Sequence, residues 1–567
     1  MSRNFKTLLI ALALTGAFGA KAMAQYPPVL QPVENPITVD KAILGKILFW
    51  DEQLSSTNSM ACGTCHFPSQ GGTDARSGDD DSLHPGANGT FGDGDETIGS
   101  KGVLSASFGG QLNDDGTFFP NVQVTGRKTP SNLDATNFPD LFWDGRATSE
   151  FIDPQTGAVA IAAGGGLESQ SVGPPLSNVE MAHGNRGWDS IVFKIDRVDP
   201  LRLATNLTPD IQAALAVNPT YPALFAAAFG PAMPGDPLVS SKRIAFAIAT
   251  YQRTLISDQT PYDDFVAGNM SALTLAQQNG LTAFQGAAMC TTCHAGELFS
   301  TGQFFNTGVV DPNIDIGRMA VTMDSLDLGL MKTPGLRNVG LREPTGLFHH
   351  GVGNGSSLTN VVSFYNTGPN FTQNTSPLIF ALGLGAGTVA DIADFLRFGL
   401  TDPRAASETG VFSRPTLRSE EDALQNPATS SRFFFGGLAA LQHAAGHTPK
   451  MLVEGPPSRE NTFFTIGLGN TNSNTTAYLV SGDLEPSGIV GSIPFPVFIQ
   501  NNAQLEITGI ITQGGANPGD GFGSFTISIS DNPALVGFVV SAQWFVVDLA
   551  ATNGFASTEA VRLSILP

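Results

Sequence analysis

Hydrophobic and polar residues follow two different periodicities along this chain. Up to about residue 412, apolar residues recur at helical spacing in short segments, which long Gly-, Pro- and Asn-rich stretches separate. Beyond residue 450, apolar and polar residues alternate between turn-forming residues, which is typical of strands. The helical segments include 44–49, 275–286 and 390–400, and the strand segments include 504–512, 523–530 and 538–549. We therefore expect a mainly α region with long loops, followed by a C-terminal all-β region of sandwich type.

The first 24 residues have the pattern of a secretory signal peptide. Arg3 and Lys6 precede the apolar run 7–18, and Ala22 and Ala24 frame an A-x-A cleavage site. An uncleaved membrane anchor is the alternative, but the run is too short to span a bilayer comfortably. The rest of the sequence has no stretch of eighteen apolar residues, so we expect a protein that is periplasmic or otherwise exported and has no membrane span.

Length and charge narrow the function classes. The 567 residues suffice for two or three domains, and 50 acidic against 29 basic residues give a net charge of −21. Loss of the leader with its three basic residues leaves 26 basic residues and a net charge of −24. Such a chain lacks the basic surface that neutralises phosphates, which excludes nucleic acid as a partner. A macromolecular partner should instead present a basic face.

All four cysteines fall into two copies of one motif. The copies are Cys62-Gly63-Thr64-Cys65-His66 and Cys290-Thr291-Thr292-Cys293-His294. C-x-x-C-H is the attachment signature of c-type haem, in which two thiols form thioethers and the following His binds the iron. A redox dithiol or a zinc site made of both pairs would leave the histidines unexplained, and disulfides within the pairs would close small, strained loops. The sequence thus predicts two covalently attached haem c groups, in separate domains because 228 residues separate the motifs.

Around these motifs the sequence resembles the bacterial di-haem cytochrome c peroxidase and MauG family. The resemblance runs from about residue 44 to residue 404. It rests on segments such as LFWDGRA (141–147), LESQSVGPPLSNVEM (167–181) and KTPGLRNVGL (332–341). It implies two mainly α cytochrome c-type lobes.

The resemblance and the change of hydrophobic periodicity together divide the chain into five parts. After the signal peptide at 1–24, we expect an N-terminal, peroxidatic haem c domain at 25–240 and a C-terminal, electron-transfer haem c domain at 241–412. A linker at 413–450 and a β-sandwich-like accessory domain at 451–567 complete the chain.

In the family, a Gln and a Glu ten residues apart flank the peroxide pocket, and Gln170 and Glu180 have that spacing. The resemblance gives Glu180 the acid–base role in O–O cleavage and Gln170 the role of orienting peroxide. Without that spacing, both would be taken for surface groups. Trp143 matches the family's tryptophan between the two haems, and a core position is compatible with that role.

Tyr365 is a departure from the classical peroxidases. Alignment on Leu358 puts it where their second haem takes Met as its other axial ligand, and MauG-like members have Tyr there. Met stabilises ferrous iron, whereas a phenolate-like oxygen favours higher oxidation states. Tyr365 is therefore a candidate axial ligand, and simple aromatic packing is the alternative. The methionines that could replace it are Met319, Met323 and Met331.

Other departures concern the first haem and calcium. Classical members carry a removable distal His, and the corresponding acidic, Gly-rich stretch 71–116 offers only His84, either as that ligand or as a loop residue. If it is not a ligand, the first iron needs no reductive activation. Lys128 stands at the family's Asn ligand to calcium, and its charge argues against the ion. His349 matches a family turn and is expected to support the haem site or to be a buried turn histidine.

These features predict an exported di-haem c-type peroxidase. It would reduce hydrogen peroxide with electrons from a small cytochrome c or a cupredoxin-like donor. A MauG-like oxidase of a protein or small-molecule target is the close alternative, and a non-catalytic di-haem electron carrier or haem-based sensor is the alternative of another class. Because family members are often dimers, a homodimer is also expected.

Overall fold

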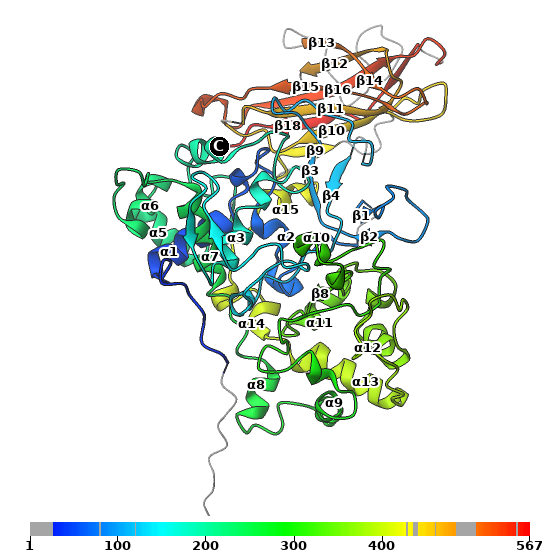
Figure 1. Cartoon of the computed structure of the whole chain (residues 1–567). Coiled ribbons are helices and arrows are strands. Elements are labelled where there is room, and N and C mark those ends of the chain that lie inside the picture. The colour runs from blue at the N-terminus through cyan, green and yellow to red at the C-terminus, as the bar shows by residue number, and fades with distance from the viewer. Residues whose placement is uncertain are drawn as a thin grey trace, which may run out of the picture.

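The computed structural model describes residues 26–78, 81–118, 121–426, 429–434, 440–459, 461–482, 506–551 and 554–567. The expected signal peptide lies outside the described residues. Within those ranges, no helix combines the length and the apolar character that crossing a bilayer requires. A helical region with long loops lies below a stack of strands (Figure 1), as the two hydrophobic periodicities of the sequence predict.

Helices begin where the sequence offers a capping side chain. The hydroxyl oxygens of Thr38, Ser240, Thr274 and Ser357 each accept a backbone N–H at the start of a helix. The helices are α1 (Val39–Phe49), α2 (Cys62–Cys65), α3 (Gly166–Ser171), α4 (Trp188–Ile195), α5 (Pro209–Val217), α6 (Tyr221–Phe229), α7 (Ser241–Gln252), α8 (Pro261–Val266), α9 (Leu275–Gln285), α10 (Met319–Thr322), α11 (Val339–Arg342), α12 (Leu358–Thr367), α13 (Ala386–Asp394), α14 (Pro403–Ala406) and α15 (Arg418–Ala423). Two-stranded ribbons lie in the loops between them: β1 (Leu83–His84) with β2 (Thr97–Ile98), β3 (Lys101–Leu104) with β4 (Val122–Val124), β5 (Phe151–Ile152) with β6 (Val159–Ile161), and β7 (Phe304–Phe305) with β8 (Met331–Lys332).

The helices gather around two apolar clusters. The first contains side chains of α1 and α4 to α7, and α1 packs along α7. The second contains α9, α12 and α13, where the rings of Phe284, Phe299 and Phe395 meet edge to face at 5.9–6.1 Å. The expected boundary after residue 240 would assign α7 to the second unit, but α7 lies in the first cluster because its apolar residues face α1.

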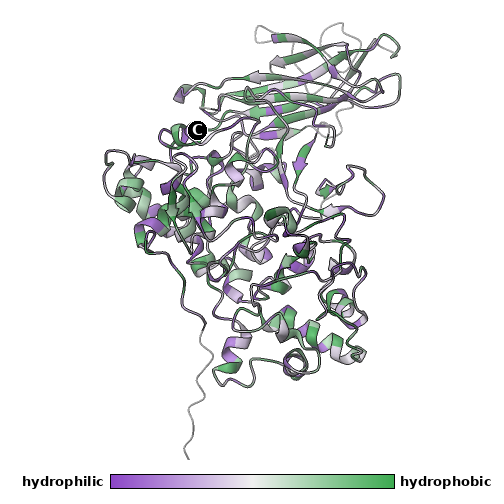
Figure 2. Ribbon diagram, viewed as in Figure 1, coloured by the Kyte–Doolittle hydropathy of each residue, from purple (hydrophilic) through white to green (hydrophobic). Residues whose placement is uncertain are grey.

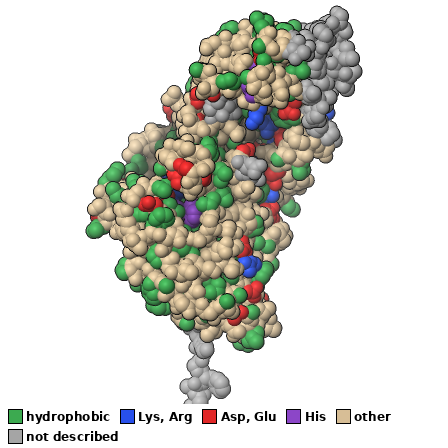
Figure 3. All heavy atoms as spheres, turned by 90° about the vertical axis from the view of Figure 1, so that its right-hand side faces the viewer, with side chains coloured by type: hydrophobic (Ala, Val, Ile, Leu, Met, Phe, Trp, Pro, Cys, Tyr) green, Lys and Arg blue, Asp and Glu red, His purple; other side chains and the backbone are tan. Residues whose placement is uncertain are grey.

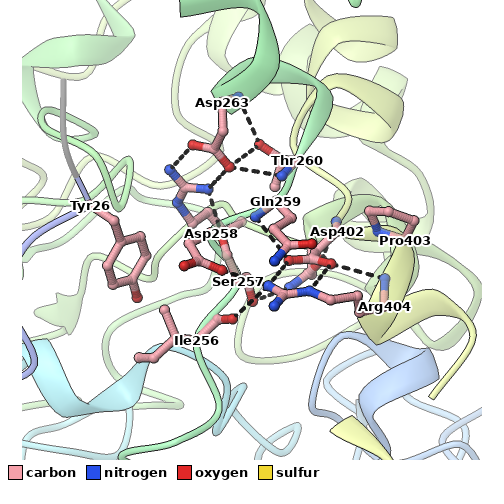
Figure 4. Close-up of polar contacts among 12 residues, drawn as sticks. Tyr26, Ile256, Ser257, Asp258, Gln259, Thr260, Asp263, Asp402, Pro403 and Arg404 are labelled. Atoms are coloured by element: carbon pink, nitrogen blue, oxygen red, sulfur yellow. Dashed lines mark hydrogen bonds and ion pairs between the residues drawn. The ribbon is translucent and has the colours of Figure 1, made fainter. Parts of the chain in front are cut away.

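A polar junction fixes the two clusters to one another. Figure 4 shows Asp263 and Asp402 on either side of the segment that leads from α7 to α8. The N–H of Ser257 donates to Asp134, beside the first cluster, at 2.8 Å, and the hydroxyl of Ser257 accepts the Nδ2–H of Asn338, at the start of α11 in the second cluster, at 2.7 Å. The hydroxyl of Tyr26 donates to Asp134 at 2.6 Å, which brings the start of the described chain to the same junction.

The C-terminal region consists of two antiparallel sheets on one core. One sheet has the order β10-β11-β15-β14, and the other has the order β13-β12-β16-β18-β9, with β17 paired to β16. Apolar residues of both sheets, including Leu468 and the fully buried Trp544, belong to one cluster. Figure 2 shows apolar and polar residues alternating along these strands. The strands are β9 (Arg432–Phe434), β10 (Lys450–Glu454), β11 (Phe464–Thr471), β12 (Thr476–Gly482), β13 (Glu506–Ile511), β14 (Gln513–Gly514), β15 (Gly521–Ile527), β16 (Val539–Val547), β17 (Phe555–Ser557) and β18 (Val561–Ser564). β9 lies in the expected linker, so the sheet begins before residue 451.

Candidate active site

The first C-x-x-C-H motif forms α2 at the wall of a cavity of about 450 Å³, which we call the first cavity. Gly63 is required there, because a Cβ would lie 2.2 Å from the ring of Trp50. The Nδ1–H of His66 donates to the carbonyl oxygen of Gly72 at 2.9 Å. Since a carbonyl can only accept, this bond leaves the lone pair on Nε2, the nitrogen that an iron takes.

The second motif lies at the wall of a cavity of about 240 Å³, the second cavity. The Nδ1–H of His294 donates to the carbonyl oxygen of Phe299 at 2.8 Å, which repeats the arrangement at His66. Burial lowers the pKa of His294 to about 4, so the ring is neutral and able to bind a metal. All four cysteines are described, and no disulfide joins them.

The lining of the second cavity fits a haem. The buried guanidinium of Arg342 lines the second cavity and donates through Nη2 to Gly335 and Arg337 carbonyls at 2.8 and 2.9 Å. Its Nε–H has no partner among the described atoms, and a haem propionate would satisfy it. Six residues would hold the two groups: Cys62, Cys65 and His66 in the first cavity, and Cys290, Cys293 and His294 in the second.

Gln170 lines the first cavity from α3. A buried ion pair anchors this helix, since Arg253 Nη1 lies 2.7 Å from Glu168 Oε1 and both side chains are at most 1% exposed. Gln170 follows Glu168 by two residues and therefore lies on another face of the helix. The structure thus gives Gln170 a rigid support at the cavity wall.

Glu180 lines the same cavity. It ends a tight turn in which the carbonyl of Ser177 accepts the N–H groups of residues 180–182 at 2.9–3.1 Å. Burial raises the pKa of Glu180 above its ordinary value, while a hydrogen bond with Ser177 and the charge of Arg146 act in the opposite direction. Arg146, which stacks on the ring of Phe142 at 3.7 Å, also lines the cavity and was not singled out from the sequence.

One wall separates the two cavities. Lys128, Trp143, Lys332 and His349 line both of them. The indole N–H of Trp143 donates to the carbonyl of Lys128 at 2.8 Å, and its ring lies edge-on to that of His349 at 6.1 Å. Burial lowers the pKa of His349 to about 4, although Asp315 lies 3.8 Å from its Nε2. Trp143 and His349 therefore both lie in the wall that the two cavities share.

Tyr365 is a half-buried side chain of α12 that lines the second cavity. Burial raises the pKa of its phenol, and the nearby Cys293 and Cys290 thiols add to that effect. Of the alternative methionines, Met331 lines this cavity, whereas Met323 is 81% exposed. Tyr365 and Met331 are therefore both positioned at the second haem site.

Two histidines line the first cavity near the β1–β2 ribbon. The Nδ1 of His84 accepts the N–H of Gly86 at 3.1 Å, which places the hydrogen of the neutral ring on Nε2. In that tautomer the ring offers no lone pair to an iron. His350 is buried, stacks on Phe348, and has no partner for Nδ1 among the described atoms. Both His349 and His350 line this cavity.

Lys128 stands at the sequence position of the family's Asn ligand to calcium. Its amine donates to the carbonyl oxygen and the hydroxyl of Thr345 at 2.7 and 2.8 Å. Burial lowers the pKa of Lys128 to about 7. Because calcium needs six to eight oxygen ligands, these residues do not fit the ion.

Comparison with known proteins gives consistent matches. The sequence profile of the di-haem cytochrome c peroxidase family matches residues 39–271. The methylamine utilization protein MauG of Methylophilus methylotrophus is 29% identical over 55% of this chain and 69% of its own. Cytochrome-c peroxidase IdrP1 of Pseudomonas sp. (strain SCT) is 27% identical over 74% of this chain and 97% of its own. A crystal structure of a MauG-like protein associated with microbial copper homeostasis gives a TM-score of 0.48 at 24% identity, over 70% of this chain and 99% of that chain.

Proposed function

We propose that this chain, whose residues 39–271 match the sequence profile of the di-haem cytochrome c peroxidase family, is a peroxidase-type oxidoreductase that reduces hydrogen peroxide in the first cavity. One observation carries the proposal: His66, Gln170 and Glu180 meet at the wall of that cavity. The bound haem groups would supply the iron at which the O–O bond breaks and the electrons for the reduction.

Glu180 is assigned the proton transfer. Cleavage of the O–O bond requires a proton to move from the inner to the outer peroxide oxygen, and the carboxylate accepts it from one and returns it to the other. Burial raises the pKa of Glu180 toward the working pH, which suits a group that must both take and give a proton. The Gln170 amide orients the peroxide without competing for that proton. Two electrons and two protons convert each peroxide into two waters.

A haem in the second cavity would supply the electron-transfer centre. His294, Cys290 and Cys293 would hold it there, and Trp143 offers a large polarisable ring in the wall that the two cavities share. This division makes the N-terminal haem domain peroxidatic and the C-terminal one an electron-transfer domain.

Tyr365 favours a second candidate function. A phenol at the second iron would stabilise higher oxidation states, and a MauG-like oxidase of a protein or small-molecule target would use them. Under either function we do not assign His84 as a ligand of the first iron, because its Nδ1 accepts the N–H of Gly86. We also propose that Lys128 replaces calcium between the two haem domains.

The partner and location follow from charge and from the leader. Acidic side chains are spread over the face drawn in Figure 3, in keeping with the net charge of −24 expected after export. The donor is therefore a small cytochrome c or cupredoxin-like protein with a basic face, met in the periplasm. A homodimer is the assembly proposed by family resemblance.

Rapid mixing of the purified holoprotein with peroxide tests these assignments. Reaction only after half-reduction supports the classical peroxidase, and reaction of the oxidised protein supports the MauG-like function. Two six-coordinate haems that ignore peroxide in both states would refute both and identify an electron carrier.

A further inference from the structure

The C-terminal β region lies against the segment that leads into the first haem motif. The Nδ2–H of Asn58 donates to the hydroxyl of Ser458 at 3.2 Å, and both side chains are buried. Gly455 has φ +74°, and a Cβ there would lie 2.0 Å from the carbonyl oxygen of Thr57. The backbones of the two regions therefore touch four to five residues before Cys62.

The same face of the β region also contacts the segment that follows Glu180. The ring of Phe463 meets the buried ring of His183 edge-on at 5.8 Å. The backbone N–H of His183 donates to the hydroxyl of Ser56 at 3.0 Å, and the N–H of Ser56 donates to the carbonyl of Met181 at 2.9 Å. Residues 181–183 are thus held between the β region and the residues before the haem motif.

The β3–β4 hairpin forms a second connection between the same parts. At its tip, the hydroxyl of Thr465 donates to the carbonyl of Gly110 at 2.8 Å, and the N–H of Leu112 donates to Ser524 at 3.2 Å. At its base, Gly102 packs so closely that a Cβ would lie 1.8 Å from the carbonyl of Val179. Leu104, Ala106, Leu112 and Phe522 form one apolar cluster across this contact.

We propose that the C-terminal β region is a positioning part of the peroxide site, which holds the 177–184 segment, and with it Glu180, against the first cavity. The catalytic significance of this arrangement rests on the function proposed above. A carboxylate that transfers a proton must be held within a fraction of an ångström, and a displacement of about 1 Å costs roughly a hundredfold in rate. No residue of the β region lines the first cavity among the described side chains, so it acts through the segment that it holds.

The test compares three holoprotein variants. Phe463→Ala removes the ring that contacts His183, Phe463→Leu retains an apolar side chain there, and Phe538→Ala removes a 53% exposed ring elsewhere in the same β region. Hydrogen–deuterium exchange of residues 180–184 reports whether the segment is held, because their N–H groups bond to Ser177, Ser56 and Ala106. Exchange in α9 serves as the folding control.

Phe463→Ala should speed exchange in residues 180–184 and leave α9 unchanged. It should also slow the peroxide reaction roughly ten- to a hundredfold and move the acid limb of its pH profile, while Phe463→Leu restores both and Phe538→Ala changes neither. Unchanged exchange would overturn the proposal, and so would faster exchange with an unchanged rate and pH profile. A wild-type protein inert to peroxide would refute the proposed function instead, and the exchange data would still decide whether the β region holds the segment.

Discussion

Glu180→Gln is the substitution that tests the proposed chemistry most directly. Gln has nearly the same shape as Glu, so the variant keeps the packing of the cavity wall while it loses the titratable proton carrier. General acid–base catalysis contributes about 10² to 10⁴ in rate, which corresponds to a barrier about 3–5.5 kcal/mol higher in the variant. The contact with Ser177 and the nearby Arg146 charge remain in place, so this loss should come from proton transfer alone.

Stopped-flow mixing with peroxide over a range of pH measures the effect. Burial raises the pKa of Glu180, and only the ionised carboxylate can accept a proton. The wild-type rate should therefore fall, as pH decreases, at a higher pH than for an ordinary glutamate, and the variant should lack that limb. Glu150→Gln, on an exposed side chain in the same region, is the matched control. A Glu180→Gln protein that reacts within a factor of about three of wild type, or that keeps the acid limb, would refute the role of Glu180.

Four further outcomes are expected. Tyr365→Phe should change the ligand-field bands of the second haem, and an unchanged spectrum would remove Tyr365 as a ligand. Chelation of divalent cations from the purified holoprotein should leave its spectrum and its peroxide rate unchanged, and a chelator-sensitive rate would contradict the replacement of calcium by Lys128. Lys128→Met should lower the free energy of unfolding in denaturant by about 1–3 kcal/mol, because it leaves the Thr345 carbonyl unpaired. Arg253→Met should destabilise the protein by about 3–5 kcal/mol, since it leaves the buried Glu168 carboxylate without its cationic partner, and the double variant with Glu168→Leu should recover most of that loss. Turnover with a small basic cytochrome should slow steeply as salt rises, and a salt-independent rate would exclude the electrostatic docking.

Hydrophobic periodicity and capping residues predicted those helices and strands that depend mainly on nearby residues. The expected helix at 275–286 corresponds to α9, with Thr274 as its cap, and the three expected strand segments overlap β13, β15 and β16. Boundaries between units were harder to predict. From its sequence α7 could belong to either helical cluster, and the packing of its buried face against α1 places it in the first. The short β9 has no alternation long enough to be recognised, and its pairing with β18 comes from the far end of the chain.

The residues of the two C-x-x-C-H motifs could be singled out from the sequence because each motif is contiguous. The wall of the cavities could not, since it is assembled from distant segments. Lys128 meets Thr345 across 217 residues, and no local pattern predicts that pairing. Arg146 and His350 belong to the cavity by the same long-range assembly, although the first lay within a segment that carried the family resemblance.

The shared wall also has a consequence for how this protein could be retuned. Because the same side chains face both cavities, the two redox centres have one dielectric boundary in common. A change of charge or volume at Trp143 or Lys332 should therefore shift both midpoint potentials together. A substitution that is meant to shift only one midpoint potential therefore has to be made on the side of that cavity away from the shared wall.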